Sequence, residues 1–376
     1  MSKFIRRDTS VLGNWWWTVD HWLLISVLTL VVIGIILSVS ASPFVATKIG
    51  FNRFYFVKRH LLMVPISVVT MIIISLLSPM NIRKLSAIIL LASIILLIYV
   101  LLFGHDVKGS KRWLIIFGIS VQPSEFVKPA FFVIVAWLLA ERHLDDHFAG
   151  TKVSIVLMSI IAGLTLCQPD IGMTFIIIAP CLMQVFVAGL RLVYVIGAII
   201  FAISGFIVSY FFIPHVTKRV DAFFHPQFND ADQLYQIRQS MEAFHNGGWF
   251  GCGPGEGVVK RFVPDAHSDF VFSVAGEEYG IFLCLFIACL FCFIVIRSLL
   301  LVFNNQDAFA IYSITGLATQ FGLQSFINMS TALKLIPTKG MTLPFISFGG
   351  SSMLSASIAM GFILALTRRR HGVILE

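Results

Sequence analysis

The chain has 376 residues, of which 58% are hydrophobic and only 12% are charged. A water-soluble globule of this length needs far more polar surface, so the composition excludes a soluble fold and indicates an integral membrane protein. The net charge of +8 does not indicate a nucleic-acid partner, because the basic residues are scattered over the ends of apolar segments. The six cysteines show neither a disulfide framework nor the spacing of a metal site.

Apolar runs of membrane-spanning length follow one another along the chain and predict an all-α integral membrane protein with about ten transmembrane helices. We expect residues 1–376 to form a single polytopic domain. The counts of Lys and Arg in the short loops place the segment 1–21 and the tail 367–376 in the cytoplasm. The apolar runs lie near 22–40, 59–77, 85–103, 125–141, 153–168, 171–189, 193–213, 271–302, 308–331 and 343–366.

One long connection, residues 214–270, falls on the outer face in this topology. Its content indicates order, because apolar residues recur at near-helical spacing from Leu234 to Phe244 and are followed by Gly247 and Gly248. This pattern predicts an amphipathic helix that lies on the membrane surface.

The stretch "QPSEFVKPAFF" places two ionisable groups at the start of an apolar run. Glu125 and Lys128 are three residues apart and therefore share a helix face. A structural ion pair explains them, and so does a cavity in which the Lys128 ammonium meets a phosphate. The spacing alone does not choose between these two roles.

The stretch "CQPDIGMT" breaks two apolar runs at the outer face and carries Asp170. An ionisable group beside the membrane is a candidate site residue. An exposed acid in a tight turn between two helices is the alternative interpretation.

The stretch "FVPDAHSDFVFSVAGEEYG" places Asp269 directly before an apolar run. We expect a helix that begins at Asp269 and is capped by Ser268. Ser273 and Gly276 would then share a face with the acid, so that a groove of small residues runs down from the carboxylate. The alternative is an acid that only stabilises the end of the helix.

The glycine-rich stretch "GWFGCGPGEGVVKR" lacks the features of a P-loop. No strand precedes it, and no Ser or Thr follows the lysine. We expect a close-packed turn that brings Lys260 and Arg261 near the membrane surface, where they would attract anions.

Five motifs, in this order, resemble the SEDS family, the ten-helix polymerases of bacterial peptidoglycan. They are "GSKRWLIIFGISVQPSEFVKP", "QPDIGMT", "GGWFGCGPGEG", "PDAHSDFVFSVAGEEYG" and "PTKGMTLPFISFGGSS". The stretches "KRVDAFFHP" (218–226), "GPGEGVVKR" and "GMTLPFISFGGSS" resemble the division branch of the family more than the elongation branch. Asp265, Ser268 and Phe348 depart from the residues usual in the family, so no hydroxyl role is assigned to position 348.

The resemblance implies a glycosyltransferase that polymerises lipid II, the undecaprenyl-diphosphate disaccharide-pentapeptide, into glycan strands outside the inner membrane. It makes Asp269 the essential acid and supports Glu125, Lys128 and Asp170 as cavity residues. Inversion at the donor sugar needs a base, for which Asp269 is suited, and a positive charge near the diphosphate, for which Lys128 is suited. Ser273, Lys260 and Arg261 complete the substrate-binding candidates.

The implied partners are lipid II, the nascent glycan strand, membrane lipid, a class B penicillin-binding protein (an FtsI-like transpeptidase) and other division proteins. No cofactor, resident metal site or nucleic-acid partner is expected, although a divalent cation such as magnesium is possible. The expected location is the inner membrane at the division septum. The alternatives are a lipid II flippase, an elongation-type polymerase and a non-catalytic scaffold.

Overall fold

The protein is described from a computed structural model. It covers residues 11–104, 106–107, 110–116, 119–145, 147–212, 217, 231–302, 306–337 and 340–368. The stretch 218–226, Lys339 and the tail beyond Arg368 lie outside the described residues.

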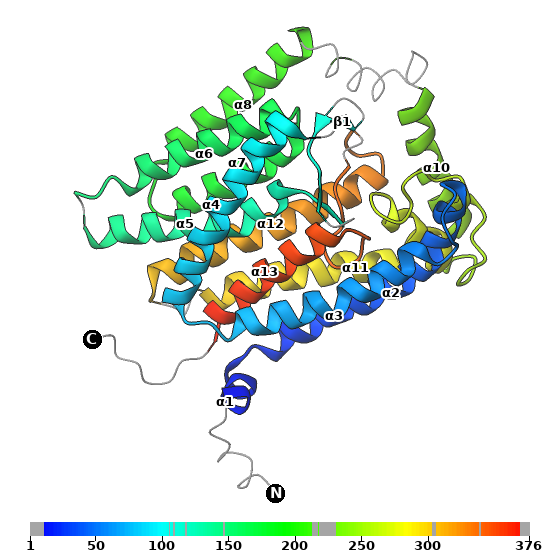
Figure 1. The fold of residues 1–376 in the computed structure, drawn as a ribbon, viewed down its shortest axis with the longest axis horizontal. Coiled ribbons are helices and arrows are strands. Elements are labelled where there is room, and N and C mark those ends of the chain that lie inside the picture. Colours follow the sequence, from blue (N-terminus) through cyan, green and yellow to red (C-terminus); the bar gives the residue numbers. More distant parts are fainter. Residues whose placement is uncertain are drawn as a thin grey trace, which may run out of the picture.

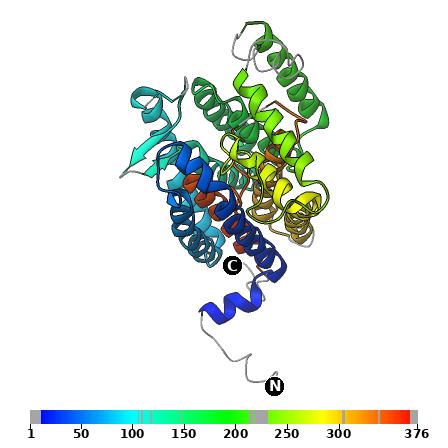
Figure 2. The same cartoon turned by 90° about the vertical axis from the view of Figure 1, so that its right-hand side faces the viewer.

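Within the described residues, ten helices correspond to the ten predicted spans and pack into one bundle (Figures 1 and 2). The fold class predicted from the sequence is therefore confirmed. The helices are α2 (His21–Lys48), α3 (Tyr55–Ser75), α4 (Pro79–Phe103), α5 (Pro123–Leu144), α6 (Gly150–Cys167), α7 (Ile171–Val187), α8 (Leu192–Phe212), α11 (Val271–Val302), α12 (Ala308–Ala332) and α13 (Gly350–Leu366).

The lipid-facing and central helices differ in how much of their surface is buried. In the described chain, α2 to α6 and α11 are each long and apolar enough to cross a membrane, and α7 and α13 are shorter apolar helices. On α4, Ile88, Leu91, Ile95 and Leu102 form an exposed stripe at helical spacing, as expected for a face that contacts lipid. The span of α5 is 78% buried, which makes α5 the central helix against which α4, α12 and α13 pack.

Four smaller elements complete the described fold. Helix α1 (Val11–Thr18) precedes α2, and two short antiparallel hairpins connect α4 to α5. These hairpins were not predicted from the sequence; they are β1 (Asp106–Val107) with β2 (Ser110–Lys111) and β3 (Leu114–Ile116) with β4 (Ile119–Val121). The long connection contains α10 (Ala231–Gly247) and a short 3₁₀ helix, η2 (Val259–Arg261).

The two ends of the described chain meet at the same end of the bundle. Arg368, after α13, donates to the Thr18 hydroxyl (Nε to Oγ1, 3.0 Å), and Arg297 of α11 pairs with Asp20, the residue before α2 (2.7 Å). We call this the termini end. At the opposite end, Ser40 of α2 meets Lys260 of the long connection (Oγ to Nζ, 3.0 Å), and we call this the loop end. The side of the membrane on which the termini end lies stays a prediction.

The start of α11 differs from the predicted start. The helix begins at Val271, and the Ser268 hydroxyl donates to the Asp265 carbonyl (3.4 Å) instead of accepting a helix N–H. The cause is a turn centred on Asp265, whose φ of 50° is left-handed and whose carbonyl accepts the N–H groups of Ser268, Asp269 and Phe270. Asp269 therefore belongs to this turn and lies two residues before the helix.

Two other boundaries also move. Helix α11 is interrupted at Gly280, whose φ is 75°. A side chain there would collide with the Trp249 carbonyl, so glycine is required both for the kink and for the close approach of the glycine-rich turn. Helix α13 begins at Gly350 and not near 343, because residues 340–349 form an irregular segment, the 340–349 loop, in which the Leu343 N–H donates to the Ser347 hydroxyl (2.8 Å).

Candidate active site

Asp269 is held against two other parts of the chain at the loop end. Its side chain is half-buried, and its backbone carbonyl accepts a hydrogen bond from Asn328 Nδ2 of α12 (2.9 Å). Gly340 lies against the carboxylate so closely that an added Cβ would be 3.0 Å from Asp269 Oδ2. The turn before α11, the end of α12 and the 340–349 loop thus converge on this acid.

The 340–349 loop is fastened to the stretch around Asp269 at both of its ends. Asn328 Nδ2 also donates to the Met341 carbonyl (2.5 Å). Further along the loop, the Ser347 hydroxyl donates to the Ser268 carbonyl (2.5 Å), and the Phe348 N–H donates to the His267 carbonyl (2.9 Å). Asp269 therefore has a fixed backbone, although it lies outside regular secondary structure.

Lys128 and Glu125 form the ion pair that their spacing allows. Lys128 Nζ lies 2.8 Å from Glu125 Oε2 and donates to Gln324 Oε1 of α12 (2.8 Å). Both residues are buried, with Lys128 only 1% exposed. In this conformation the charge of Lys128 is buried and is neutralised by Glu125. The backbone carbonyl of Glu125 also accepts a hydrogen bond from the Ser355 hydroxyl of α13 (2.6 Å).

A row of amide side chains that was not predicted from the sequence lies on one face of α12. Gln320, Gln324 and Asn328 are buried and spaced by four residues. Gln320 Nε2 donates to Gln324 Oε1 (2.9 Å), and Gln324 Nε2 donates to the Thr342 carbonyl (3.0 Å). This row links Lys128 to the 340–349 loop. The signal in the sequence was three amides at helical spacing within an apolar run.

Asp170 has a structural explanation as well as a charged partner. It caps α7 by accepting the Met173 N–H (3.1 Å), and it pairs with Arg112 (3.0 Å) from the segment that follows β2. Arg112 also donates to the carbonyls of Gln168 and Pro169 (3.1 and 2.6 Å). The pair ties the hairpin segment to the start of α7.

The expected groove beside Ser273 is filled by α10. The Ser273 hydroxyl bonds to that of Ser240 (2.6 Å), and Ser240 also donates to the Ala332 carbonyl (2.6 Å). A Cβ at Gly276 would lie 2.3 Å from the Phe244 ring, so the small residues accommodate α10 and leave no open channel at this point. The buried side of α10 is turned to α11, while Met241 is 40% exposed.

Lys260 and Arg261 differ in their surroundings. Lys260 is buried and forms an ion pair with Glu278 of α11, to which Ser40 of α2 also donates. The neighbouring Glu277 accepts the backbone N–H groups of Val259 and Lys260 (both 2.7 Å), which fixes η2 against α11. The expectation of a surface cation at Lys260 does not match this enclosure, whereas Arg261 is exposed, with its guanidinium 4.6 Å from the centre of the Phe44 ring.

His267 lies in an aromatic cluster beside the candidate acid. Its ring stacks on Phe56 of α3 (centroids 4.6 Å apart) and lies 5.5 Å from Phe348 of the 340–349 loop. Burial lowers the pKa of His267, and the nearby charge of Asp265 partly opposes this change. The imidazole therefore favours its neutral form at neutral pH.

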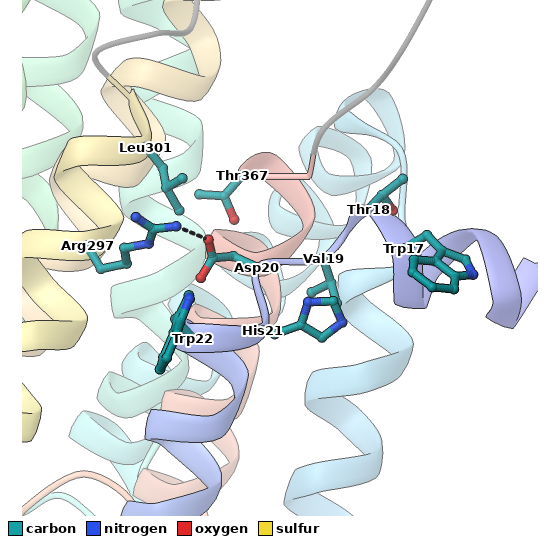
Figure 3. Close-up of a pocket in the computed structure, with 9 residues that line it drawn as sticks. All are labelled: Trp17, Thr18, Val19, Asp20, His21, Trp22, Arg297, Leu301 and Thr367. Carbon is teal, nitrogen blue, oxygen red and sulfur yellow. Dashed lines mark hydrogen bonds and ion pairs between the residues drawn. The ribbon is translucent and has the colours of Figure 1, made fainter. Parts of the chain in front are cut away.

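A pocket of about 240 Å³ lies at the other end of the molecule, between the start of α2, the last turns of α11 and the end of α13 (Figure 3). Asp20 and Arg297 pair inside it, with Trp22 beside them. None of the predicted site residues lines this pocket. Within the described part of the chain, no group of three or more His, Cys, Asp or Glu side chains is placed to hold a metal ion, and the possibility of magnesium stays a prediction.

The fold and the acid at the loop end define a polytopic membrane protein with a polar site at one end of its helical bundle. The family model described as "Cell cycle protein", which covers FtsW, RodA and SpoVE, matches residues 21–372. The chain belongs to the FtsW/RodA/SpoVE family, and the resemblance seen in the motifs is confirmed.

Two curated relatives and two solved structures cover nearly the whole chain. The protein from Caulobacter vibrioides is 42% identical over 98% of this chain and 94% of the relative, and the one from Trichlorobacter lovleyi is 34% identical over 93% of each. Both are named "Probable peptidoglycan glycosyltransferase FtsW".

The two solved structures show the same fold. A chain from the structure described as "Structural coordination of polymerization and crosslinking by a peptidoglycan synthase complex" has a TM-score of 0.78 at 23% identity and covers 93% of this chain and 97% of its own length. The rod shape determining protein RodA of Thermus thermophilus has a TM-score of 0.65 at 23% identity and covers 93% of this chain and 96% of its own length.

Proposed function

We propose that the chain is a peptidoglycan glycosyltransferase of the cell-division machinery, which polymerises lipid II into glycan strands with inversion at the donor sugar. The names of its curated relatives support this assignment. The structural observation that carries it is the half-buried Asp269, whose backbone is fixed by Asn328 and whose carboxylate abuts Gly340. A fixed acid at the end of a membrane bundle suits a reaction on a lipid-linked substrate.

The reaction requires a general base, and we assign this role to Asp269. Forming a β-1,4 bond from an α-linked diphosphate requires that the attacking 4-hydroxyl lose its proton as the bond to the diphosphate breaks. The Asp269 carboxylate accepts that proton in our proposal. Because its backbone is already ordered, little positioning entropy has to be lost when the substrate binds.

The leaving diphosphate needs positive charge near it. We propose that Lys128 supplies this charge when the substrate draws it away from Glu125. The ammonium group has three N–H donors, of which the contacts to Glu125 and Gln324 use two. Asp170 then holds Arg112 at the loop end, and Arg261 attracts the substrate from its exposed position. Lys260 and Ser273 make enclosed contacts that a structural role explains, and we give them no contact with the substrate.

The partner proposed is a class B penicillin-binding protein that crosslinks the strands made here, at the division septum and with both termini of this chain in the cytoplasm. A solved structure of the same fold is described as part of a peptidoglycan synthase complex, which supports a joint assembly. The exposed apolar faces of the bundle leave room for a transmembrane segment of such a partner.

The test is polymerisation of purified lipid II by the purified chain, with and without that transpeptidase, read as glycan ladders on a gel. A parallel assay follows lipid II translocation in vesicles. Ladders that require the chain support the proposal. Translocation without polymerisation would contradict it and favour a flippase, and depletion that makes cells round instead of filamentous would favour the elongation role.

A further inference from the structure

We infer that Asn328 is a positioning residue for the reaction, because it locks the backbone of Asp269 to the 340–349 loop. The inference rests on the proposed function, since it takes Asp269 as the base. It gives a role to a side chain that carries no charge and that neither the motif analysis nor the ion pairs single out.

The side-chain amide of Asn328 binds two segments that are distant in sequence. Asn328 is 1% exposed, and its Nδ2 donates to the carbonyls of both Asp269 (2.9 Å) and Met341 (2.5 Å). An –NH₂ group has two N–H donors, so both are used. The two acceptors belong to the turn before α11 and to the 340–349 loop, and this single side chain joins them.

A further contact lies one turn earlier on the same face of α12. Gln324 Nε2 holds the Thr342 carbonyl (3.0 Å), while its Oε1 accepts from Lys128 Nζ (2.8 Å). Adjacent loop carbonyls, those of Met341 and Thr342, are thus held by two amides from one helix. The far end of the loop returns to the same turn through the bond from the Phe348 N–H to the His267 carbonyl.

Few side chains other than asparagine would serve at position 328. Aspartate would place a carboxylate against two carbonyl oxygens, and leucine would leave both carbonyls unpaired in a buried site, so both should fail. In the described part of the chain, Asn328 Oδ1 has no hydrogen-bond partner. A buried acceptor without a partner costs free energy. The amide is therefore explained by its two N–H donors and not by its oxygen.

The expected effect of losing this amide is on turnover. In Asn328→Ala the backbone of Asp269 loses its bond to α12, so its carboxylate can shift, and a misplacement of about 1 Å costs about 10²-fold in kcat. We expect KM to change little. The acid limb of the pH profile should also stay in place, because Asn328 contacts the carbonyl of Asp269 and not its carboxylate. Asn328→Gln keeps the donors and should recover part of the activity.

The experiment compares Asn328→Ala, Asn328→Gln and Ser325→Ala in lipid II polymerisation by the full chain, with Asp269→Asn as the reference. Ser325 lies on the same helix, and within the described residues its hydroxyl donates to the Gly322 carbonyl (2.9 Å) and to no part of the site, so its variant should keep wild-type kcat. Hydrogen–deuterium exchange adds a readout apart from activity. In Asn328→Ala, the amides of Leu343 and Phe348 should exchange faster, while those of α5 should not.

A second variant keeps the inference testable if Asn328→Ala does not fold. Asn328→Ser replaces the two N–H donors by one O–H donor, so at most one of the two carbonyls stays paired, and it should lower kcat about tenfold. Wild-type kcat in a folded Asn328→Ala, or in Asn328→Ser, would overturn the inference while Asp269→Asn stays inactive. A fully active Asp269→Asn would instead overturn the proposed function, so the two failures are distinguishable.

Discussion

Two buried Lys–Glu pairs lie at the loop end, and they differ in what they connect. Lys128 and Glu125 are one turn apart on α5, and Lys128 reaches the 340–349 loop through Gln324. Lys260 and Glu278 come from η2 and α11, and Ser40 joins them from α2. The first pair lies on a path to the candidate acid, whereas the second fastens the long connection to the bundle. Burial of a charge alone therefore does not identify a catalytic group.

The largest effect expected is on folding at the second pair. Lys260→Met leaves the Glu278 carboxylate buried without its cation, which costs about 3–5 kcal/mol. The doubly neutral variant, Lys260→Met with Glu278→Gln, should restore both the thermal midpoint and polymerisation, because no buried charge then lacks a partner. Thermal unfolding in detergent and the gel assay measure the two properties. If the double variant folds but does not polymerise, Lys260 has a role in the reaction.

The first pair should respond in the opposite way. The neutral variant Lys128→Met with Glu125→Gln should fold, because it too leaves no buried charge alone, yet lose about 10²-fold in kcat. Lys128→Ala should lower activity more than Lys128→Arg, since arginine retains the positive charge. Matched amounts of folded protein in the gel assay give the comparison. Full activity of the neutral variant would reduce Lys128 to a structural ion pair.

A smaller effect follows from His267, which contacts neither pair. Its pKa is lowered by burial, so the unfolded chain binds more protons than the folded chain below the ordinary value of 6.5. Stability is then complete above that value and falls as the pH drops through it. His267→Phe suits the stack with Phe56 and should remove this part of the pH dependence. Thermal midpoints between neutral and mildly acidic pH test it, and parallel curves for the two proteins would contradict it.

The smallest effect is expected at the termini end. Arg297 is about a third exposed, although its partner Asp20 is only 9% exposed, so Arg297→Gln should cost less than the loss of the fully buried Lys260 and leave polymerisation unchanged. Asp20 keeps its cap on α2 through the Leu23 N–H. A strong loss of activity in this variant would show that the termini end takes part in the reaction.

The helices were predictable because each apolar run is long enough to dominate its own structure. Every predicted span matches a helix, but some ends differ by several residues: α2 continues to Lys48 instead of ending near 40, and α4 begins at Pro79 instead of near 85. Helix α13 begins at Gly350 instead of near 343, because the 340–349 loop is ordered by side chains such as Ser347 and not by periodicity. The hairpins between α4 and α5 escaped prediction because strands of two or three residues carry no period that can be distinguished from a loop.

The candidate site was only partly predictable. Glu125 and Lys128 are local neighbours, so their pairing followed from helix geometry. The pair between Lys260 and Glu278 depends on how a glycine-rich turn folds back onto α11, which no local pattern specifies. Asn328 escaped notice because an uncharged amide in an apolar run has many structural explanations, and its role depends on two carbonyls distant in sequence.

The most direct test of the central claim is glycan polymerisation by Asp269→Asn. The amide keeps the size of the side chain but cannot accept the proton, so polymerisation should fall by about 10²- to 10⁴-fold while the protein folds and binds its partner. Asp265→Asn is the matched control, because asparagine also tolerates the left-handed backbone found there and should cost much less. Purified proteins, matched in amount, are compared on lipid II ladders. Ladders of wild-type intensity from Asp269→Asn would contradict the assignment of the base.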